Sequence, residues 1–286
     1  MIHVLYHANC HDGFGAAWAM WRRVNAEVLD FHAVGYGEES LKLAGDGKLY
    51  LLDFSYPREV LLAYARERSV VVLDHHKTAA LDLLDLDGLP NLTVRFDLCK
   101  SGAVLAWEHF HPGVSVPLML QYVQDRDLWR FELPHSREVA AWMRSWPFSF
   151  PSWDNLERVV DPVDGDLAAV WQEGAAILRF QDQQVRLMAD QAVALTLGGH
   201  KVHAASATCF FSEVCEELCR RYPDEPFAAY WRDGANGRRM WGLRSRSGRG
   251  GDDAPLFDCS ALAKRYGGGG HPGAAGFETQ RNWWGD

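Results

Sequence analysis

The stretch VVVLDHHK, residues 70–77, decides how the rest of the chain is interpreted. Its first four residues are apolar and β-branched or aliphatic, which is typical of a strand buried on both faces in a parallel sheet. The strand stops at Asp74, His75 and His76, which offer a carboxylate and two imidazoles within a few ångströms. A lone histidine is more often structural, but this triplet indicates a metal or catalytic site.

Two other apolar runs end at side chains of the same kind. The run 2–6 is followed by His7, and the run 49–52 is followed by Asp53. Because the carboxyl ends of parallel strands lie at one edge of a sheet, the three groups are expected to converge there. Asp53 alone would more often cap a turn before Pro57. The three strand ends together favour a shared site.

The segments between these strands have apolar residues at helical spacing, notably 14–24 and 58–68. Alternation of strands and helices predicts an α/β fold with a mainly parallel sheet and helices on both faces. Further helices are expected at 103–110, 117–123 and 137–144, after which Pro147 and Pro151 are expected to break the pattern.

The length of 286 residues suggests two domains at about 150 residues each. Residues 167–195 are helical in composition and are expected to connect them. Beyond this helix, a strand, a helix and a hairpin around 233–237 predict a smaller α/β domain with a mixed sheet, and 245–253 is expected to be a glycine-rich loop. The expected domains are 1–185 and 186–286.

Composition and charge exclude several classes of protein. The chain is 48% hydrophobic and 23% charged, which excludes disordered and collagen-like chains. Its net charge of −9 argues against long duplex DNA and anionic membranes as partners. Six cysteines lack CxxC spacing, so free thiols are expected. With no signal-like start and no apolar run of about 18 residues, we expect a cytoplasmic protein.

Further acidic residues lie where they could complete a metal site. Asp12 follows the first strand, and Asp125 or Asp127 in QDRDLW lies near a helix end. Carboxylates and imidazoles together are typical of Mn, Mg or Zn hydrolases. The helix that begins near Phe14 would direct its amino end to the same edge, where backbone N–H groups favour phosphate.

The glycine-rich stretch YGGGGHPGAAGF, residues 266–277, is the second distinctive motif. Glycines let the backbone approach a ligand closely, so we expect a phosphate or base cradle formed by Gly268, Gly269, Gly270 and His271. The pattern GxGxxG within it does not indicate a dinucleotide fold, because it follows a helical segment rather than a strand. Arg244 is a candidate phosphate clamp.

With LDHHK and GGGGHPGAAGF in place, the chain resembles the DHH-family phosphoesterases with a DHH-associated C-terminal domain, of the type that degrades oligoribonucleotides or adenosine bisphosphate. The resemblance implies a metal site on the first domain, a substrate-holding second domain and a cleft between them. Members of the family also include single-strand exonucleases, cyclic dinucleotide phosphodiesterases and pyrophosphatases.

The resemblance also implies metal ligands. The matching positions are Asp12, Asp53 as a bridging carboxylate, His75 and Asp125, with His7 nearby. The family's usual first motif, HxxxDxD, is replaced by HANCHDG, in which Cys10 stands where an aspartate is usual. The resemblance implies one or two divalent ions, normally Mn; a thiolate at Cys10 would favour Zn, Fe or Co.

The expected activity is therefore metal-dependent phosphoester hydrolysis. His76, His271 and Arg244 would stabilise charge on the phosphoryl oxygens, and Asp74 would orient a neighbouring imidazole. The expected substrates are small nucleotides: short single-stranded oligonucleotides, nucleoside 3',5'-bisphosphates or cyclic dinucleotides. A pyrophosphate or polyphosphate hydrolase and a catalytically weak nucleotide sensor stay open as alternatives, and so does a homodimer.

Overall fold

The computed structural model describes residues 1–24, 26–35, 38–234, 237–246 and 257–285. The chain divides into two compact units, Met1–Leu178 and Arg179–Asp286. The expected boundary at residue 185 falls within the helix that joins them, α8 (Leu167–Ala189). No helix in these described ranges combines the length and the apolarity that a membrane crossing requires.

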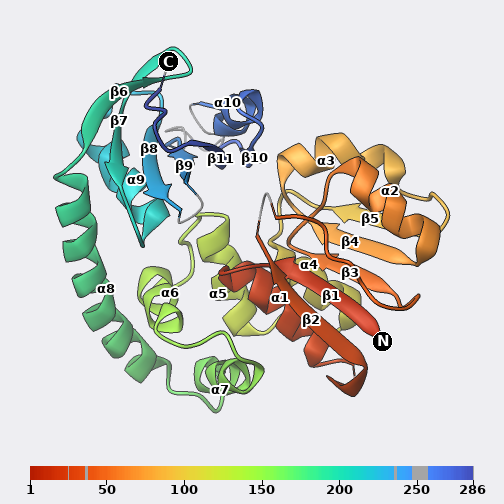
Figure 1. Ribbon diagram of the computed structural model, residues 1–286. Coiled ribbons are helices and arrows are strands. Elements are labelled where there is room, and N and C mark those ends of the chain that lie inside the picture. The colour runs from red at the N-terminus through yellow and green to blue at the C-terminus, as the bar shows by residue number, and fades with distance from the viewer. Residues whose placement is uncertain (25, 36–37, 235–236, 247–256, 286) are drawn as a thin grey trace. The chain divides into compact units, whose positions relative to one another are not determined.

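Unit 1 is built on a five-stranded sheet in the order β2-β1-β3-β4-β5, and every pair of neighbours is parallel (Figure 1). The fold class predicted from the sequence is thus confirmed for this unit. Its strands are β1 (Ile2–His7), β2 (Leu29–Val34), β3 (Leu49–Leu52), β4 (Val70–Asp74) and β5 (Leu92–Phe96).

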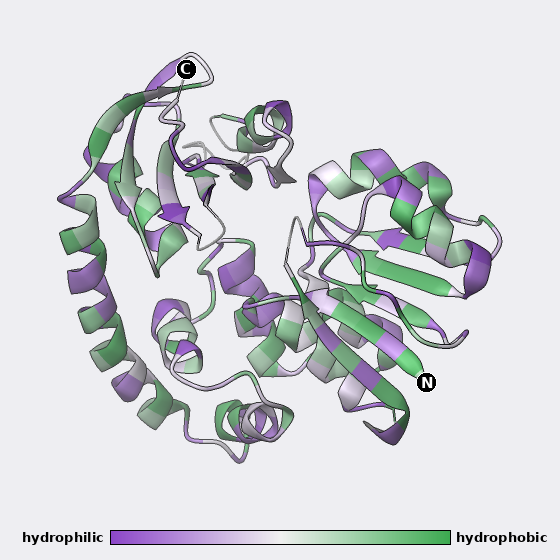
Figure 2. Cartoon of the chain, viewed as in Figure 1, coloured by the Kyte–Doolittle hydropathy of each residue, from purple (hydrophilic) through white to green (hydrophobic). Residues whose placement is uncertain are grey.

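The central strands β3 and β4 are nearly continuous apolar runs (Figure 2), as expected of parallel strands that pack against a core on each face. Val71 and Leu73 of β4 pack into one core, whereas Val70 and Val72 pack into the other. This alternation follows from the two-residue period of a strand. Both cores cover the strands, so polar groups are accommodated at the strand ends.

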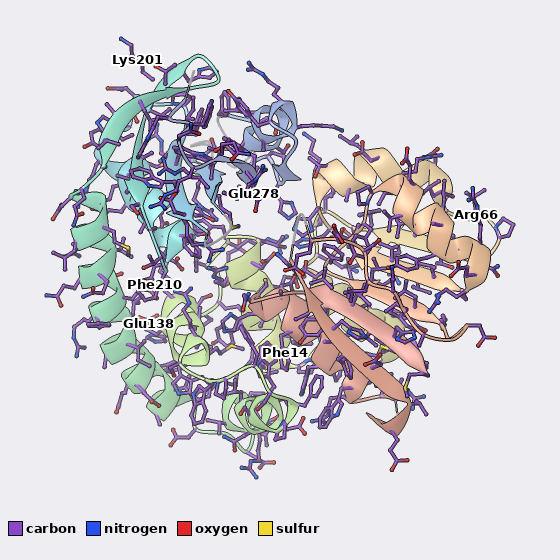
Figure 3. The ribbon with its side chains drawn as sticks, in the orientation of Figure 1. Phe14, Arg66, Glu138, Lys201, Phe210 and Glu278 are labelled. Atoms are coloured by element: carbon purple, nitrogen blue, oxygen red, sulfur yellow. The ribbon has the colours of Figure 1, made fainter. Side chains whose placement is uncertain are left out.

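Helices cover both faces of this sheet. The first core contains side chains of α1, α4, α5, α6 and α7, and the second contains side chains of α2 and α3. Phe14 of α1 (Figure 3) contacts Phe150 and Trp153 of α7, with ring centroids 5.2 and 5.0 Å away. The helices are α1 (His11–Trp21), α2 (Arg58–Glu67), α3 (Lys77–Leu83), α4 (Gly102–Phe110), α5 (Leu118–Asp127), α6 (Ser136–Arg144) and α7 (Phe150–Val160), with short 3-10 turns at Ala26–Val28 and Leu84–Leu86.

One expectation about unit 1 is wrong. Pro151 was expected to break the helical pattern, but it lies in the first turn of α7. Proline is tolerated there because its missing N–H has no helical partner at that position. The Ser149 side chain caps the helix by accepting a hydrogen bond from the backbone nitrogen of Ser152.

Unit 2 contains a mixed sheet in the order β10-β11-β9-β8-β7-β6; among its described strands, β7 and β8 pair in parallel and the other neighbours are antiparallel. Side chains of α10 pack in one of its cores and those of α9 in the other. The elements are β6 (Val193–Leu197), β7 (His200–Ser206), α9 (Phe211–Arg221), β8 (Ala228–Asp233), β9 (Arg238–Arg244), α10 (Cys259–Arg265), β10 (Gly269–Gly270) and β11 (Ala274–Gln280).

The sequence-based expectations for unit 2 are confirmed in outline. A mixed sheet is present, and β8 and β9 form the predicted antiparallel hairpin. Residues 235–236 of its turn, and 247–253 of the expected glycine-rich loop, lie outside the described residues. The cleft implied by the family resemblance stays a prediction.

Trp153 offers a test of the core packing in unit 1. Its side chain is fully buried, so Trp153→Ala should lower the free energy of unfolding by about 3–5 kcal/mol, because it removes a large apolar group and leaves a cavity. Trp146→Ala is the matched control, since that ring is 37% exposed. Urea denaturation measures both, and equal losses in the two variants would contradict this packing.

Candidate metal centre

The strand order places two polar groups at the point where the chain reverses its direction across the sheet. β1 lies between β2 and β3, so the chain continues from β1 towards one edge of the sheet, at β2, and then crosses back to build the other side from β3 onwards. Ligands of open α/β sheets bind beyond the carboxyl ends of the strands at such a point. His7 ends β1 and Asp53 follows β3, and His7 Nδ1 lies 3.5 Å from Asp53 Oδ2.

Asp53 is held in position by its backbone. Its φ of +54° is in the left-handed region, which aspartate tolerates better than most residues. Its backbone nitrogen donates a hydrogen bond to the carbonyl oxygen of Leu73 on β4 (2.9 Å). Gly102 packs against it so closely that an added Cβ would lie 2.5 Å from Asp53 Cβ. The residue that begins α4 must therefore be small.

Asp12 reaches the same place from the first turn of α1. Its carboxylate accepts hydrogen bonds from the backbone nitrogens of Gly102 (2.6 Å) and Ala103 (2.9 Å), which begin α4. A helix amino terminus stabilises negative charge because its first N–H groups have no helical acceptor. The amino end of α4 thus orients a carboxylate of the protein itself.

Three carboxylates surround the ring of His75. Its Nε2 atom lies 3.0 Å from Asp53 Oδ1, 3.4 Å from Asp12 Oδ2 and 3.6 Å from Asp127 Oδ2. His75, Asp12 and Asp53 are each 1% exposed. Three acidic groups around one buried imidazole form a site that favours a cation.

A second group of three lies beside the first. His7, Asp53 and His76 present one ligand atom each, all within 4.8 Å of one another, and Asp12, His75 and Asp127 meet the same criterion. Asp53 Oδ2 faces His7 while Oδ1 faces His75, so one carboxylate reaches both groups.

Asp74 organises the two histidines from behind. Its Oδ1 accepts hydrogen bonds from the ring of His76 (Nδ1, 2.6 Å) and from the backbone nitrogen of His75 (2.7 Å). Its Oδ2 accepts a hydrogen bond from the Ser55 hydroxyl (2.5 Å). Burial works to raise the pKa of Asp74, but the neighbouring His76 lowers it to about 2. This carboxylate is therefore ionised and fixes the orientation of the His76 ring.

Burial and neighbouring charges shift the pKa values of the groups in the cluster. Burial lowers the pKa of His75, yet the carboxylates of Asp53, Asp127 and Asp12 raise it well above its usual value. Burial and the charges of Asp53 and Asp127 raise the pKa of Asp12 well above its usual value. Asp53 is affected in the opposite sense: burial works to raise its pKa, but the imidazoles of His7 and His75 hold it well below.

The donor set fits a divalent metal. Asp53 Oδ1 is buried and makes no hydrogen bond within the described part of the chain, although His75 Nε2 lies 3.0 Å away. A carboxylate oxygen and an imidazole nitrogen that are close but not aligned with each other are placed as two ligands of one ion would be. Oxygen and nitrogen donors together suit Mn²⁺, Fe²⁺ and Zn²⁺.

Asp125 and Asp127 have different surroundings. The Asp125 carboxylate accepts hydrogen bonds from the backbone nitrogens of Glu132 (3.0 Å) and Leu133 (3.2 Å), so it closes the turn after α5. Asp127, two residues later and the last residue of α5, has the carboxylate next to His75. Asp125, which the family resemblance implies as a ligand, is therefore engaged in a turn, whereas the carboxylate of Asp127 lies in the cluster.

Cys10 and two arginines lie beside the cluster. A pocket within unit 1 is lined by residues of α1, α5 and α6, including Cys10, Asp12, Arg126, Asp127 and Arg144. Burial raises the pKa of the Cys10 thiol. The arginines were not found from the sequence, because a single arginine in a helix is usually a solvated surface residue.

The glycines of the second motif form a tight structure inside unit 2. Gly269 and Gly270 make up β10, which pairs with β11. A Cβ at Gly268 would lie 2.0 Å from the carbonyl oxygen of Gly276, and Gly270 has a φ of +136°. These glycines therefore let two segments of backbone approach each other; the ligand cradle expected there stays a prediction.

Arg244 and His271 belong to the same end of the unit 2 sheet. Arg244 ends β9 opposite Ala274 of β11, and its guanidinium donates a hydrogen bond to the Ser212 hydroxyl (3.1 Å). The backbone nitrogen of His271 donates to the carbonyl oxygen of Ala274 (2.8 Å). Unit 2 thus brings the predicted clamp and the predicted glycine motif together.

Comparisons with known proteins give a relative in sequence. No protein-family model matches the chain. An uncharacterised protein of Acanthamoeba polyphaga mimivirus is 30% identical over 291 residues, which cover 96% of this chain and 66% of that protein. The chain therefore spans just under two thirds of the length of this curated relative.

Solved structures give a likeness in fold. The DHH domain of a member of the s1p family of ribosomal proteins is similar with a TM-score of 0.58 and 13% identity, covering 96% of this chain and 82% of that one. A pGpG-specific phosphodiesterase from Vibrio cholerae is 14% identical, with a TM-score of 0.44, and the match covers 98% of this chain and 93% of the phosphodiesterase.

Asp125 and Asp127 can be separated by experiment. Asp127→Asn should weaken Mn²⁺ binding at least about tenfold, because a ligand charge is lost beside His75. Asp125→Asn should leave Mn²⁺ affinity unchanged and lower the free energy of unfolding by about 1–3 kcal/mol, because it weakens the turn after α5. Titration calorimetry and urea denaturation measure the two effects, and the reverse pattern would assign the ligand to Asp125.

Metal binding should release protons. Because the pKa values of His75 and His7 are raised, the charged form of each ring, with a proton on both nitrogens, is favoured without metal. An ion that binds a ring nitrogen must displace one of these protons. Mn²⁺ affinity should therefore increase as pH rises from 6 to 8, by about tenfold per pH unit for each proton released. Calorimetry at pH 7 in two buffers of different ionisation enthalpy counts the protons. Equal heats in both buffers would contradict the model of a protonated cluster.

Proposed function

We propose that this chain, which has the fold of the DHH-family phosphoesterases, is a metal-dependent phosphoesterase that acts on small nucleotides. The observation that carries the proposal is the set of three carboxylates within 3.6 Å of the buried His75 Nε2 atom. Without a cation, this buried cluster would contain more carboxylates than imidazoles, and burying unbalanced negative charge costs free energy. A divalent cation would offset that excess of negative charge.

Two adjacent ion positions account for the ligands. Asp12, His75 and Asp127 would hold one ion, and His7 and His76 the other, with Asp53 shared between them. We propose Asp127 as the ligand where the family resemblance implies Asp125, because Asp127 Oδ2 lies 3.6 Å from His75 Nε2. The carboxylate and imidazole donors are compatible with Mn²⁺, which we propose as the working ion.

Cys10 is proposed to be a lining residue rather than a ligand. Among the described residues, the group of three whose ligand atoms converge beside His75 consists of His7, Asp53 and His76 and does not include Cys10. His7 and His76 then supply the nitrogen donors of the second position. This arrangement removes the reason to prefer Zn, Fe or Co that the thiol alone would give.

The chain's own groups prepare the site for hydrolysis. When bound, divalent ions of this kind polarise a phosphoryl oxygen and make a bound water more acidic. Asp74 keeps the His76 ring in one orientation through Nδ1, so Nε2 is the ring atom that His76 would offer to an ion. The amino end of α4 holds the Asp12 carboxylate, so the ligands are positioned before substrate arrives.

The pocket beside the cluster places two arginines near the proposed ions. Arg126 and Arg144 line it together with Asp12 and Asp127. Guanidinium groups bind phosphate through paired N–H donors, and we propose that they hold a phosphate next to the one being cleaved. This supports a substrate with more than one phosphate.

Unit 2 is proposed to hold the rest of the nucleotide. Arg244, His271 and the turn at Gly268, Gly269 and Gly270 lie at one end of its sheet. The charge of −9 supports small or single-stranded substrates over long duplex DNA. Short oligonucleotides, nucleoside 3',5'-bisphosphates and cyclic dinucleotides all meet this description. A homodimer and a cytoplasmic location stay as expectations from the sequence.

The proposal predicts a specific loss of activity. With Mn²⁺ and a linear diribonucleotide, His75→Ala should lower kcat at least about 100-fold, the scale on which single charge-stabilising groups act in other enzymes. His109→Ala is the matched control, because that histidine lies on α4 against Tyr50 and Phe110. Undiminished turnover in His75→Ala would end the proposal.

The same assay separates the alternatives. Faster release of phosphate from pyrophosphate than of nucleotide from the diribonucleotide would identify a pyrophosphate hydrolase. Tight calorimetric binding of the dinucleotide with no turnover in Mn²⁺, Co²⁺ or Zn²⁺ would identify a nucleotide sensor. The phosphoesterase proposal requires nucleotide release that depends on the metal.

A further inference from the structure

Three side chains at the other end of β1 form a second group of metal-competent residues. His3 lies near the start of β1, next to Asp30 of β2 in the strand register, and His32 follows two residues later on the same face of β2. His3 Nδ1 lies 3.0 Å from Asp30 Oδ2, and His32 Nε2 lies 2.9 Å from the same oxygen. The proposed phosphoesterase site uses none of these residues.

The orientation of His3 is fixed from behind. The residue is 3% exposed, and its Nε2 atom lies 2.9 Å from the carbonyl oxygen of Ala44. A carbonyl oxygen only accepts hydrogen bonds, so Nε2 carries a proton and donates it to Ala44. Nδ1 is therefore the ring atom that faces Asp30, and it is the atom that could exchange this contact for a bond to an ion. A metal-bound histidine typically donates its second N–H to a carbonyl in this manner.

The spacing of the three donor atoms suits a small transition-metal ion. In a tetrahedral site with bonds near 2.0 Å, ligand atoms lie about 3.3 Å apart. The two nitrogen–oxygen distances of 3.0 and 2.9 Å need to widen by only a few tenths of an ångström. All three donor atoms lie within 4.8 Å of one another.

We propose that His3 Nδ1, Asp30 Oδ2 and His32 Nε2 bind a divalent transition-metal ion, with Zn²⁺ as the ion of best fit. Two imidazoles and a carboxylate are a donor set that Zn²⁺ uses, with water in a fourth position. The side chains of Asp30 and His32 are 43% and 31% exposed, so both an ion and a water can reach them.

The site joins β1, β2 and the segment that follows β2. Within the described ranges, β2 is an edge strand whose one neighbour is β1, and Ala44 lies in the segment between β2 and β3. An ion bound by β1 and β2, with its histidine anchored to residue 44, stabilises this edge of the sheet. Because it binds only the folded state, Zn²⁺ raises the stability of the chain.

The test compares bound Zn²⁺ in the full chain and in variants. The wild-type chain should bind one more Zn²⁺ than His32→Asn, as measured by equilibrium dialysis and elemental analysis. Asp30→Asn should give the same loss. Both variants should also lose the rise in Tm that Zn²⁺ produces at this site, and keep Mn²⁺-dependent turnover unchanged.

His203→Asn is the matched control. His203 Nδ1 lies 2.6 Å from Glu225 Oε1 and belongs to no group of three ligands among the described residues. This variant should bind as much Zn²⁺ as the wild type. Co²⁺ bound at the proposed site adds a visible absorption band, which His32→Asn should remove and His203→Asn should keep.

Equal Zn²⁺ content in wild type and His32→Asn would overturn the proposal. It would also be overturned if His32→Asn lowered the Tm by the same amount with and without Zn²⁺, which is the behaviour of a hydrogen-bonded network alone. The readouts are independent of turnover, so failure of the phosphoesterase proposal leaves this test intact.

Discussion

The contact of Asp53 with two imidazoles is the constraint on which the site depends. One oxygen of this buried carboxylate faces His7 and the other faces His75, so a single side chain joins the ends of β1, β3 and β4. Its position requires a left-handed backbone conformation and a glycine at the start of α4. The strand order brings His7 and Asp53 together because β1 and β3 are neighbours in the sheet.

Residues around the cluster orient the proposed ligands, whereas the ligands themselves determine its charge. Asp74, Ser55 and the amino end of α4 hold the ligands in place by hydrogen bonds. The ligands themselves carry more acid than base in a buried place, which raises the pKa of His75 and of Asp12 together. Rigid supports and unbalanced charge are the combination expected of a preorganised metal site rather than of a stabilising salt bridge.

Much of unit 1 could be predicted from the sequence because buried parallel strands are continuous apolar runs that end in polar groups. That pattern located β1, β3 and β4 together with His7, Asp53 and His75. It could not locate β2, whose sequence LDFHAV mixes polar and apolar residues because its face carries the His3 and Asp30 contacts.

Other features of the site depend on three-dimensional contacts that the spacing of residues in the sequence does not reveal. Asp125 and Asp127 are separated by one residue, so only the turn of α5 and the backbone after it decide which carboxylate enters the cluster. Gly102 had no signal in the sequence, since its importance lies in a contact with Asp53, 49 positions away. The family resemblance supplied the bridging role of Asp53, which no local pattern indicated.

The most direct test is a crystal of the chain soaked in Mn²⁺ and measured for anomalous scattering. The account predicts two peaks about 3.5–4 Å apart, the spacing of two-metal sites, with an oxygen of Asp53 bound to each. Ordered Mn²⁺ elsewhere in unit 1, with no peak at Asp53 and His75, would contradict it.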